Sequence, residues 1–139
     1  MSLENGLFQK LKGNTGVANL VGGRIFGAQF PNNTAKPTLP AIVYHTFWSD
    51  TVRTLTGPDG LRTKKIQIDC YGDKYTDALG LGDTVRSLFE GYRGTLPNGV
   101  VVQEAEVNVD EDFPAEPGHP TQGFVYRRRL EVTFRYVES

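Results

Sequence analysis

Residues 124–136, FVYRRRLEVTFRY, alternate so regularly between apolar and polar side chains that they constrain the fold more than any other stretch. Successive side chains of an extended strand point to opposite faces of a sheet. One face is therefore apolar apart from Arg128, and the other carries Arg127, Arg129, Glu131, Thr133 and Arg135. The arginine triplet is thus split between two faces. We expect Arg128 either to reach water past the sheet end or to pair with an acid such as Glu104 or Asp110.

Two further stretches have the composition of strands joined as a hairpin. Residues 41–48, AIVYHTFW, are rich in β-branched and aromatic residues on both sides of the alternation, which predicts a central strand covered on both faces. The TGPDGL turn then returns the chain as an antiparallel strand over residues 61–71. Residues 49–63 between them are long and polar for a turn, so we expect an arm that extends beyond the sheet.

A long amphipathic helix is expected in the middle of the chain. Asp73 can cap it, and its apolar residues follow the i, i+3, i+4 rule until about Arg93. Gly80 and Gly82 lie inside this pattern, and each costs on the order of 1 kcal/mol relative to alanine. Either a neighbour packs closely at the glycines or the helix breaks locally.

The chain then turns into a strand over residues 100–109, followed by a loop over residues 110–123 that holds one aromatic residue, Phe113. Strict alternation along the strand places one apolar set on a single face: Val101, Ala105, Val107 and Val109. Glu104 and Glu106 share the opposite face, where solvation or a salt bridge at an interface accounts for them.

These segments together predict an α+β fold for a single domain over residues 1–139. We expect an antiparallel or mixed sheet of about four main strands. A short N-terminal helix and the one long helix pack on one face of the sheet, and the hairpin arm extends from it.

Charges are unevenly distributed, although the net charge is only -1. No lysine or arginine occurs between Arg93 and Arg127, a segment that contains six acids. An acidic segment on one subunit can meet a basic strand face on the next. Two aromatic residues in the expected arm and loop are further contact candidates. The predicted subunit interface consists of Arg127, Arg129, Arg135, Glu104, Glu106, Asp110, Glu111, Asp112, Trp48 and Phe113.

The sequence contains no recognisable catalytic, cofactor or metal motif. His45 and Cys70 lie on two strands that we expect to pair, but a cysteine that alternates with Ile66 and Ile68 is usually a small core residue. His119 lies in a loop without a nearby catalytic partner. We therefore assign no catalytic residue, no cofactor and no metal, and do not expect an enzyme.

Several phrases along nearly the whole chain resemble the phage tail completion family, small proteins of long-tailed phages and prophages that are also called tail-to-head joining or tail terminator proteins. These phrases are LFQKLKGNTGVANLVGGRIFG, TLPAIVYHTF, IQIDCYGDKYTDALGLGDTVRSLFEG and the closing arginine-rich strand. Gly80, Gly82 and the acidic loop over residues 110–123 depart from the simplest pattern. The chain is similar in this way to the minor tail protein U of lambdoid phages.

The resemblance implies a structural role in virion assembly. Such proteins look like α+β domains that cap the tail tube and join the tail to the head, as a hexameric ring. The implied partners are other copies of the chain, the tail tube protein and a head connector or head-completion protein. The implied locations are the virion tail and, during assembly, the cytoplasm of the host bacterium.

Two other readings remain open, an enzyme of an unrecognised class and a nucleic-acid or other ligand-binding module that uses Arg127, Arg129 and Arg135. A near-neutral chain is unusual for a binder of phosphate backbones, and the aromatic residues of the last strand point away from those arginines. We therefore expect no specific nucleic acid as partner. No apolar run reaches the length of a membrane span and no signal peptide is recognisable, so we expect no membrane partner.

Overall fold

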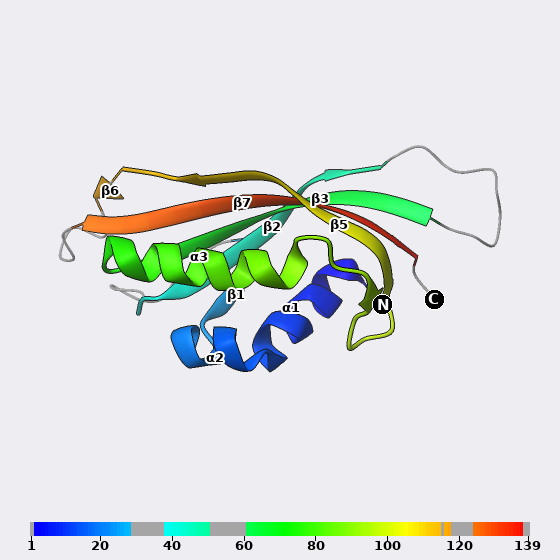
Figure 1. Cartoon of the computed structure of the whole chain (residues 1–139), viewed down its shortest axis with the longest axis horizontal. Coiled ribbons are helices and arrows are strands. Elements are labelled where there is room, and N and C mark those ends of the chain that lie inside the picture. The colour runs from blue at the N-terminus through cyan, green and yellow to red at the C-terminus, as the bar shows by residue number, and fades with distance from the viewer. Residues whose placement is uncertain (1, 29–37, 51–60, 115, 118–123, 138–139) are drawn as a thin grey trace.

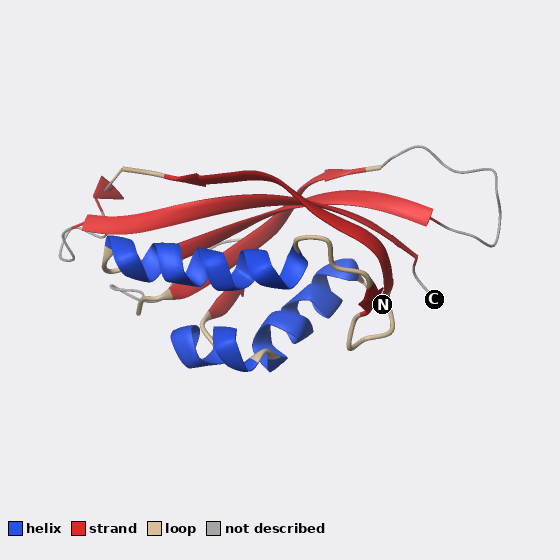
Figure 2. Cartoon of the chain, viewed as in Figure 1, coloured by secondary structure: helices blue, strands red, loops and turns tan. Residues whose placement is uncertain are grey.

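A computed structural model of the protein describes residues 2–28, 38–50, 61–114, 116–117 and 124–137. In chain order its elements are α1 (Leu3–Gly13), α2 (Thr15–Val21), β1 (Ile25–Gly27), β2 (Ala41–Ser49), β3 (Leu61–Gly72), α3 (Tyr75–Phe89), β4 (Gly94–Thr95), β5 (Val101–Asp112), β6 (Glu116–Pro117) and β7 (Phe124–Val137). The helices lie together on one side of a strongly twisted sheet (Figure 1 and Figure 2). The predicted α+β class is confirmed.

The strands form one mixed sheet in the order β1-β2-β3-β7-β5-β4, and β6 pairs with β7. Only the β1–β2 pair is parallel among the described pairs. The four long strands are β2, β3, β7 and β5, whereas β1, β4 and β6 contain only two or three residues each. The prediction of about four strands therefore missed the short ones. The expectation that residues 41–48 form a central strand is wrong, because only β1 separates β2 from the sheet edge.

Two bulges change which side chains of β5 lie on each face of the sheet. Its register against β7 shifts between Val102 and Glu104 and again between Val107 and Val109. A bulge adds one residue to a strand and moves the following side chains to the other face. The predicted shared face of Val101, Ala105, Val107 and Val109 is therefore wrong. Ala105 and Val107 lie opposite Phe134 and Val132 on the face toward the core, whereas Val101 and Val109 lie opposite Val137 and Glu131 on the polar face.

The core lies between the helices and the sheet. Leu81, Val85 and Phe89 of α3 are fully buried, and the Phe89 ring meets Phe134 of β7 edge to face, with centroids 5.5 Å apart. The helix begins one residue after Lys74, which makes no side-chain cap, so the predicted Asp73 cap is wrong. It ends at Phe89, close to the left-handed backbone of Gly91 (φ 72°), earlier than the predicted end at Arg93.

The β2–β3 hairpin is hydrogen-bonded to the first helix near the end where the two strands approach the turn. Glu4 of α1 accepts hydrogen bonds from the Thr46 hydroxyl, at 2.6 Å, and from the Lys64 ammonium group, at 2.8 Å. The Asp50 N–H group donates to the Thr63 carbonyl and closes the described part of the hairpin. Of the arm predicted over residues 49–63, Ser49 belongs to β2 and residues 61–63 belong to β3 and pair with β7, so these ends lie within the sheet. Residues 51–60 lie outside the described residues.

Candidate functional site

The sheet face opposite the helices carries the polar half of β7. We call it the outer face and define it by Arg127, Arg129, Glu131, Thr133 and Arg135 with their strand partners on β3 and β5. Each of these odd-numbered residues is paired in the ladder with an odd-numbered residue of β3, as Arg129 is with Asp69, so the two sets of side chains share one face of the sheet. The predicted alternation of β7 is therefore confirmed, and the outer face is the polar one.

The acidic and basic segments that we predicted to meet between subunits lie side by side within one chain. Arg129 of β7 pairs with Glu111 of β5, and its guanidinium group also lies 3.5 Å from Glu131. Arg135 pairs with Glu104 in the same way. Much of the charge asymmetry along the sequence is thus neutralised across the β5–β7 ladder.

Phe113 adds an aromatic surface at one end of the outer face. Its N–H group donates to the Arg127 carbonyl at 2.9 Å, which extends the β5–β7 ladder by one residue. The Arg127 guanidinium carbon lies 4.1 Å from the centre of the Phe113 ring, and that of Arg129 lies 5.3 Å away. Both distances are within the range of cation–π attraction. Phe113, the one aromatic residue of the predicted acidic loop, therefore holds two arginine side chains against its ring.

Asp69 is the most buried acid of the outer face, with 5% of its surface exposed. Its Oδ2 accepts a hydrogen bond from the Gln67 amide at 2.9 Å, and its Oδ1 lies 3.8 Å from Arg127. Burial raises the pKa of this carboxyl group, because the charged form loses its hydration. The sequence did not single out Asp69, since only the strand register shows that it packs among arginines.

Arg128 and Asp110 lie on the opposite, helix-covered face. The Arg128 guanidinium group donates from Nε and Nη2 to the two oxygens of Asp110, each at 2.7 Å. Its Nη1 donates to Asp83, at 2.7 Å, and to the Leu79 carbonyl of α3, at 2.8 Å. Of the two alternatives for Arg128, pairing with Asp110 is confirmed. Asp110 therefore binds Arg128 within its own chain, at the contact between α3 and the sheet, which we call the joint.

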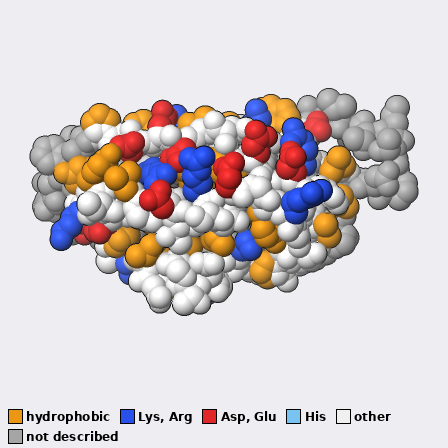
Figure 3. Space-filling view, viewed as in Figure 1, with side chains coloured by type: hydrophobic (Ala, Val, Ile, Leu, Met, Phe, Trp, Pro, Cys, Tyr) orange, Lys and Arg blue, Asp and Glu red, His pale blue; other side chains and the backbone are white. Residues whose placement is uncertain are grey.

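The same joint includes further side chains of α3 and β5. Arg86 donates to Asp110 at 2.6 Å, and the Tyr75 hydroxyl donates to Asp112. Hydrogen bonds from Arg128 and Arg86 hold the pKa of Asp110 below its usual value. Figure 3 shows acidic and basic side chains interleaved over α3 and the adjacent β5. The structure thus separates Asp110 and Asp112 from the residues that lie on the outer face.

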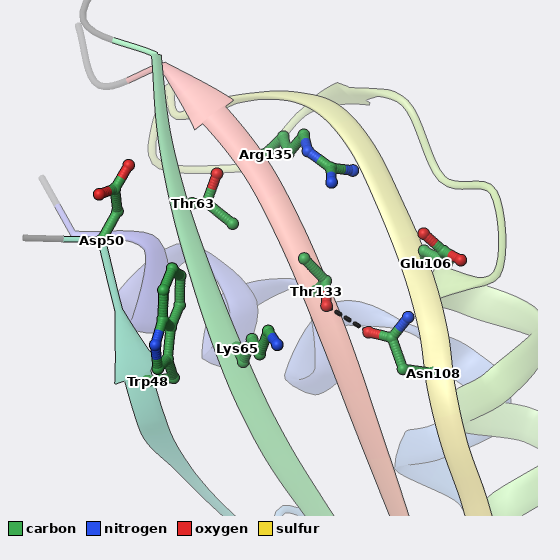
Figure 4. Close-up of a pocket in the computed structure, with 8 residues that line it drawn as sticks. All are labelled: Trp48, Asp50, Thr63, Lys65, Glu106, Asn108, Thr133 and Arg135. Carbon is green, nitrogen blue, oxygen red and sulfur yellow. Dashed lines mark hydrogen bonds between the residues drawn. The ribbon is translucent and has the colours of Figure 1, made fainter. Parts of the chain in front are cut away.

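An open hollow of about 510 Å³ lies on the outer face and brings together three of the predicted interface residues, Trp48, Glu106 and Arg135. Its lining comes from four strands (Figure 4): Trp48 and Asp50 at the end of β2, Thr63 and Lys65 from β3, Thr133 and Arg135 from β7, Glu106 and Asn108 from β5. The Lys65 ammonium group lies 5.3 Å from the Trp48 ring centre. The floor is fixed by a hydrogen bond from Thr133 to Asn108.

Trp48 is the prominent contact residue of this hollow. Its side chain is 45% exposed, and Phe47 beside it is 43% exposed. Buried tryptophans dominate the binding energy of many interfaces, so an exposed one beside a hollow favours a partner site. Glu106 forms no ion pair with any described residue, which leaves its charge available to a partner.

The structure separates His45 and Cys70, the two residues considered in the sequence as a nucleophile and its base. His45 pairs with Gln67 on the outer face, whereas Cys70 is fully buried on the other face, so the two cannot act together. Burial raises the pKa of the Cys70 thiol far above its ordinary value, which keeps it protonated. No group of three metal-ligating side chains occurs in the described ranges. His119 lies outside them.

Within the same ranges, no helix is both long and apolar enough to cross a bilayer. The arginines proposed for nucleic-acid binding have acidic neighbours in the chain, since Arg129 and Arg135 contact Glu111 and Glu104, and Arg127 lies 3.8 Å from Asp69. A phosphate backbone would have to displace these carboxylates, which weakens the binding-module reading.

Comparisons with known proteins agree with the fold. A chain in the virion of a native gene transfer agent particle superposes with a TM-score of 0.66 at 15% identity, over 97% of this chain and 94% of that chain. A second solved structure is also 15% identical, over 98% of this chain and 92% of that chain, with a TM-score of 0.48. A search of curated proteins found no match.

The family comparison is the decisive one. The family model described as Tail completion protein gp17 matches residues 5–135, which includes α2, α3, most of α1 and nearly all of the sheet. The resemblance that the sequence phrases indicated is therefore confirmed, and a structural tail role is what this family implies. The chain belongs to the Tail completion protein gp17 family and is a structural component of a phage-type virion tail.

Proposed function

We propose that this protein caps the tail tube of a long-tailed phage or prophage and joins the tail to the head, acting as a hexameric ring. The observation that carries the proposal is the family match over residues 5–135. The fold shared with a chain of a gene transfer agent virion is consistent with it. The partners in this role are other copies of the chain, the tail tube protein and a head connector or head-completion protein.

The hollow beside Trp48 supports the part of the proposal that concerns assembly. A ring subunit needs two different contact surfaces, because head-to-tail contacts are heterologous. The hollow lies on the outer face, whereas the helices cover the other face of the sheet (Figure 2). Trp48 and Glu106 line the hollow from β2 and β5, which lie toward opposite edges of the sheet, so we retain them for two different surfaces. Arg135 lies between them on β7, and Phe113 with Arg127 and Arg129 forms a further aromatic and basic area.

The direct test removes the protein and examines the particles by electron microscopy. We expect tails of uncontrolled length, or tails of correct length that never attach to heads, together with filled heads that lack tails. Supplying the intact protein in trans should restore infectious particles. Tails of normal length that are attached to heads in its absence would refute both the capping and the joining role.

A second test asks for the ring itself. Tails isolated with the protein attached should show a six-fold ring at the end that meets the head, and averaging of that end by cryo-electron microscopy would show it. A different symmetry at that end would overturn the hexamer and leave the structural tail role in place.

A further inference from the structure

One edge of the described sheet is open along half of β2. β1 pairs with β2 only from Ile42 to Tyr44, and the next backbone bond on that side runs from the Ala28 N–H group to the Tyr44 carbonyl. Residues 45–49 have no further strand beside them within the described ranges. This open part of β2 contains the exposed Phe47 and Trp48.

The opposite edge is open along most of β5. β4 pairs with β5 only at Val101 and Val102, and the loop after α3 reaches as far as Ala105, whose carbonyl accepts the Gly91 N–H group at 2.9 Å. Among the described residues, no strand lies beside residues 106–112 on the side that points away from β7. An edge strand without a neighbour has unpaired N–H and C=O groups along one side, which can bind another strand.

We propose that copies of this chain join head to tail by pairing residues 45–49 of one copy with residues 106–112 of the next. This inference rests on the proposed function, because it assigns the contact that would close the ring. In the sheet order β2-β3-β7-β5 each strand is antiparallel to the one before it, so β2 and β5 run in opposite directions. A second copy that continues the sheet therefore presents an antiparallel partner, the more stable form of strand pairing.

The charges at the two edges permit this contact. Acids on an edge strand normally prevent pairing with another chain. Here Glu104, Asp110 and Glu111 are neutralised by arginines of their own chain. Glu106 on the β5 edge has no ion pair among the described residues, and neither has Lys65, whose ammonium group lies 5.3 Å from the ring centre of the exposed Trp48 of β2. The remaining charges of the two edges are therefore opposite in sign, which suits a contact between unlike edges.

Disulfide cross-linking in assembled tails tests the contact. His45 lies on the outer face of β2, and Glu106, Val109 and Glu111 lie on the outer face of β5. We would combine His45→Cys with each of Glu106→Cys, Val109→Cys and Glu111→Cys. Residues directly opposite each other in paired strands have Cα atoms close enough for a disulfide, so the combination that cross-links identifies the register of the contact. Native Cys70 is fully buried and would not compete.

The expected result is that one double variant yields covalent multiples of the chain, up to the full ring, on non-reducing gels. The single variants should stay monomeric on the same gels. The combination of Gln67→Cys with Glu106→Cys is the matched control, because Gln67 lies on β3 in the interior of the sheet and no edge contact can reach it.

Two outcomes would overturn the inference. A dimer formed by His45→Cys alone would mean that two β2 edges pair with each other, which makes a closed dimer and no ring. An absence of cross-links from every double variant, in tails that attach to heads normally, would exclude the pairing and leave the proposed function standing. If the protein proves dispensable for tails, the proposed function fails instead.

Hydrogen exchange on the unaltered protein gives a second measurement that requires no variant to fold. Within residues 45–49 and 106–112, the amides that point away from β3 and β7 should exchange roughly tenfold more slowly in assembled tails than in the free protein. Amides of β3 and β7 in the sheet interior should change little, since they are already paired. Equal exchange at both edges in the two states would refute the contact.

Discussion

Arg128 interrupts an otherwise apolar strand face, yet only 9% of its surface is exposed. It is tolerated there because its guanidinium group meets Asp110, Asp83 and a carbonyl of α3 with good geometry. A buried ion pair adds little stability compared with a well-packed apolar pair, but removal of one partner leaves the other charge uncompensated. Arg128 therefore holds the helix to the sheet in one position.

Replacement of Arg128 should show how far the stability of the fold depends on its ion pairs. We expect Arg128→Met to lower the free energy of unfolding by about 3 kcal/mol, because the largely buried Asp110 loses both hydrogen bonds from Arg128 and keeps only the one from the more exposed Arg86. Arg135→Met is the control, since that exposed pair with Glu104 should contribute less than about 1 kcal/mol. Urea unfolding followed by circular dichroism measures both. Equal losses in the two variants would contradict this account.

Asp110 should give the joint a pH dependence. Its pKa is lowered in the folded protein, chiefly by the Arg128 hydrogen bonds, so folding favours its charged form. The stability it contributes is complete above the unfolded pKa of about 3.9 and is lost as the pH falls through the lower folded value. The difference in unfolding free energy between the natural protein and Asp110→Asn should therefore shrink between pH 5 and pH 2. A difference that stays constant over this range would disprove the assignment.

The long helix shows how two similar glycines differ once the sheet is in place. A Cβ atom on Gly82 would lie 2.3 Å from Cδ of Arg128, whereas nothing lies within 4 Å of such an atom on Gly80. The helix is continuous through both. Of the two explanations that the sequence left open, close packing by a neighbour is therefore correct for Gly82, and Gly80 has no such reason in the structure.

Alanine at these two positions should have opposite effects. Gly80→Ala should stabilise the protein by about 0.5 to 1 kcal/mol through helix propensity alone. Gly82→Ala should destabilise it despite the same gain, because Arg128 is held by Asp110 and Asp83 and cannot move aside. Thermal melting of the two single variants decides the matter. A stabilised Gly82→Ala protein would show that the arginine moves freely.

The parts of the fold that could be predicted are those with strong local periodicity. The alternation of β7, the hairpin of β2 with β3 and the apolar stripe of α3 are all visible in the sequence, because each buries one face. The short strands β1, β4 and β6 carry no such signal and form only because a longer strand lies beside them. The bulges of β5 were also invisible, since they depend on the register against β7.

At the level of the whole molecule, strand register decides what the charged residues do. The sequence separates Glu104 and Glu111 from Arg135 and Arg129 by 18 to 31 positions, and only the pairing of β5 with β7 brings them into contact. Three predicted contact residues still gather at one hollow, because Trp48, Glu106 and Arg135 lie on the same face of one sheet, on β2, β5 and β7. Their role in a subunit contact stays a prediction.

Trp48 offers the cleanest test of that prediction. We expect Trp48→Ala to change the free energy of unfolding by less than about 1 kcal/mol, because the side chain is 45% exposed, yet to reduce tail joining at least tenfold. Leu20→Ala is the matched control, a large apolar residue that is 40% exposed on α2 and distant from the hollow. Complementation of a strain that lacks the protein, scored by infectious particles, measures the effect. Equal yields from both variants would exclude the hollow as a contact.

The tie between Glu4 and the β2–β3 hairpin has a practical consequence for experiments on the protein. Glu4 lies near the start of the chain and holds Thr46 and Lys64, beside the aromatic residues that we assign to a subunit contact. A bulky affinity tag or fluorescent protein inserted directly before α1 would therefore lie close to that contact. Such a fusion should fold normally yet compete with the neighbouring subunit for space, so a short removable tag suits assembly studies better.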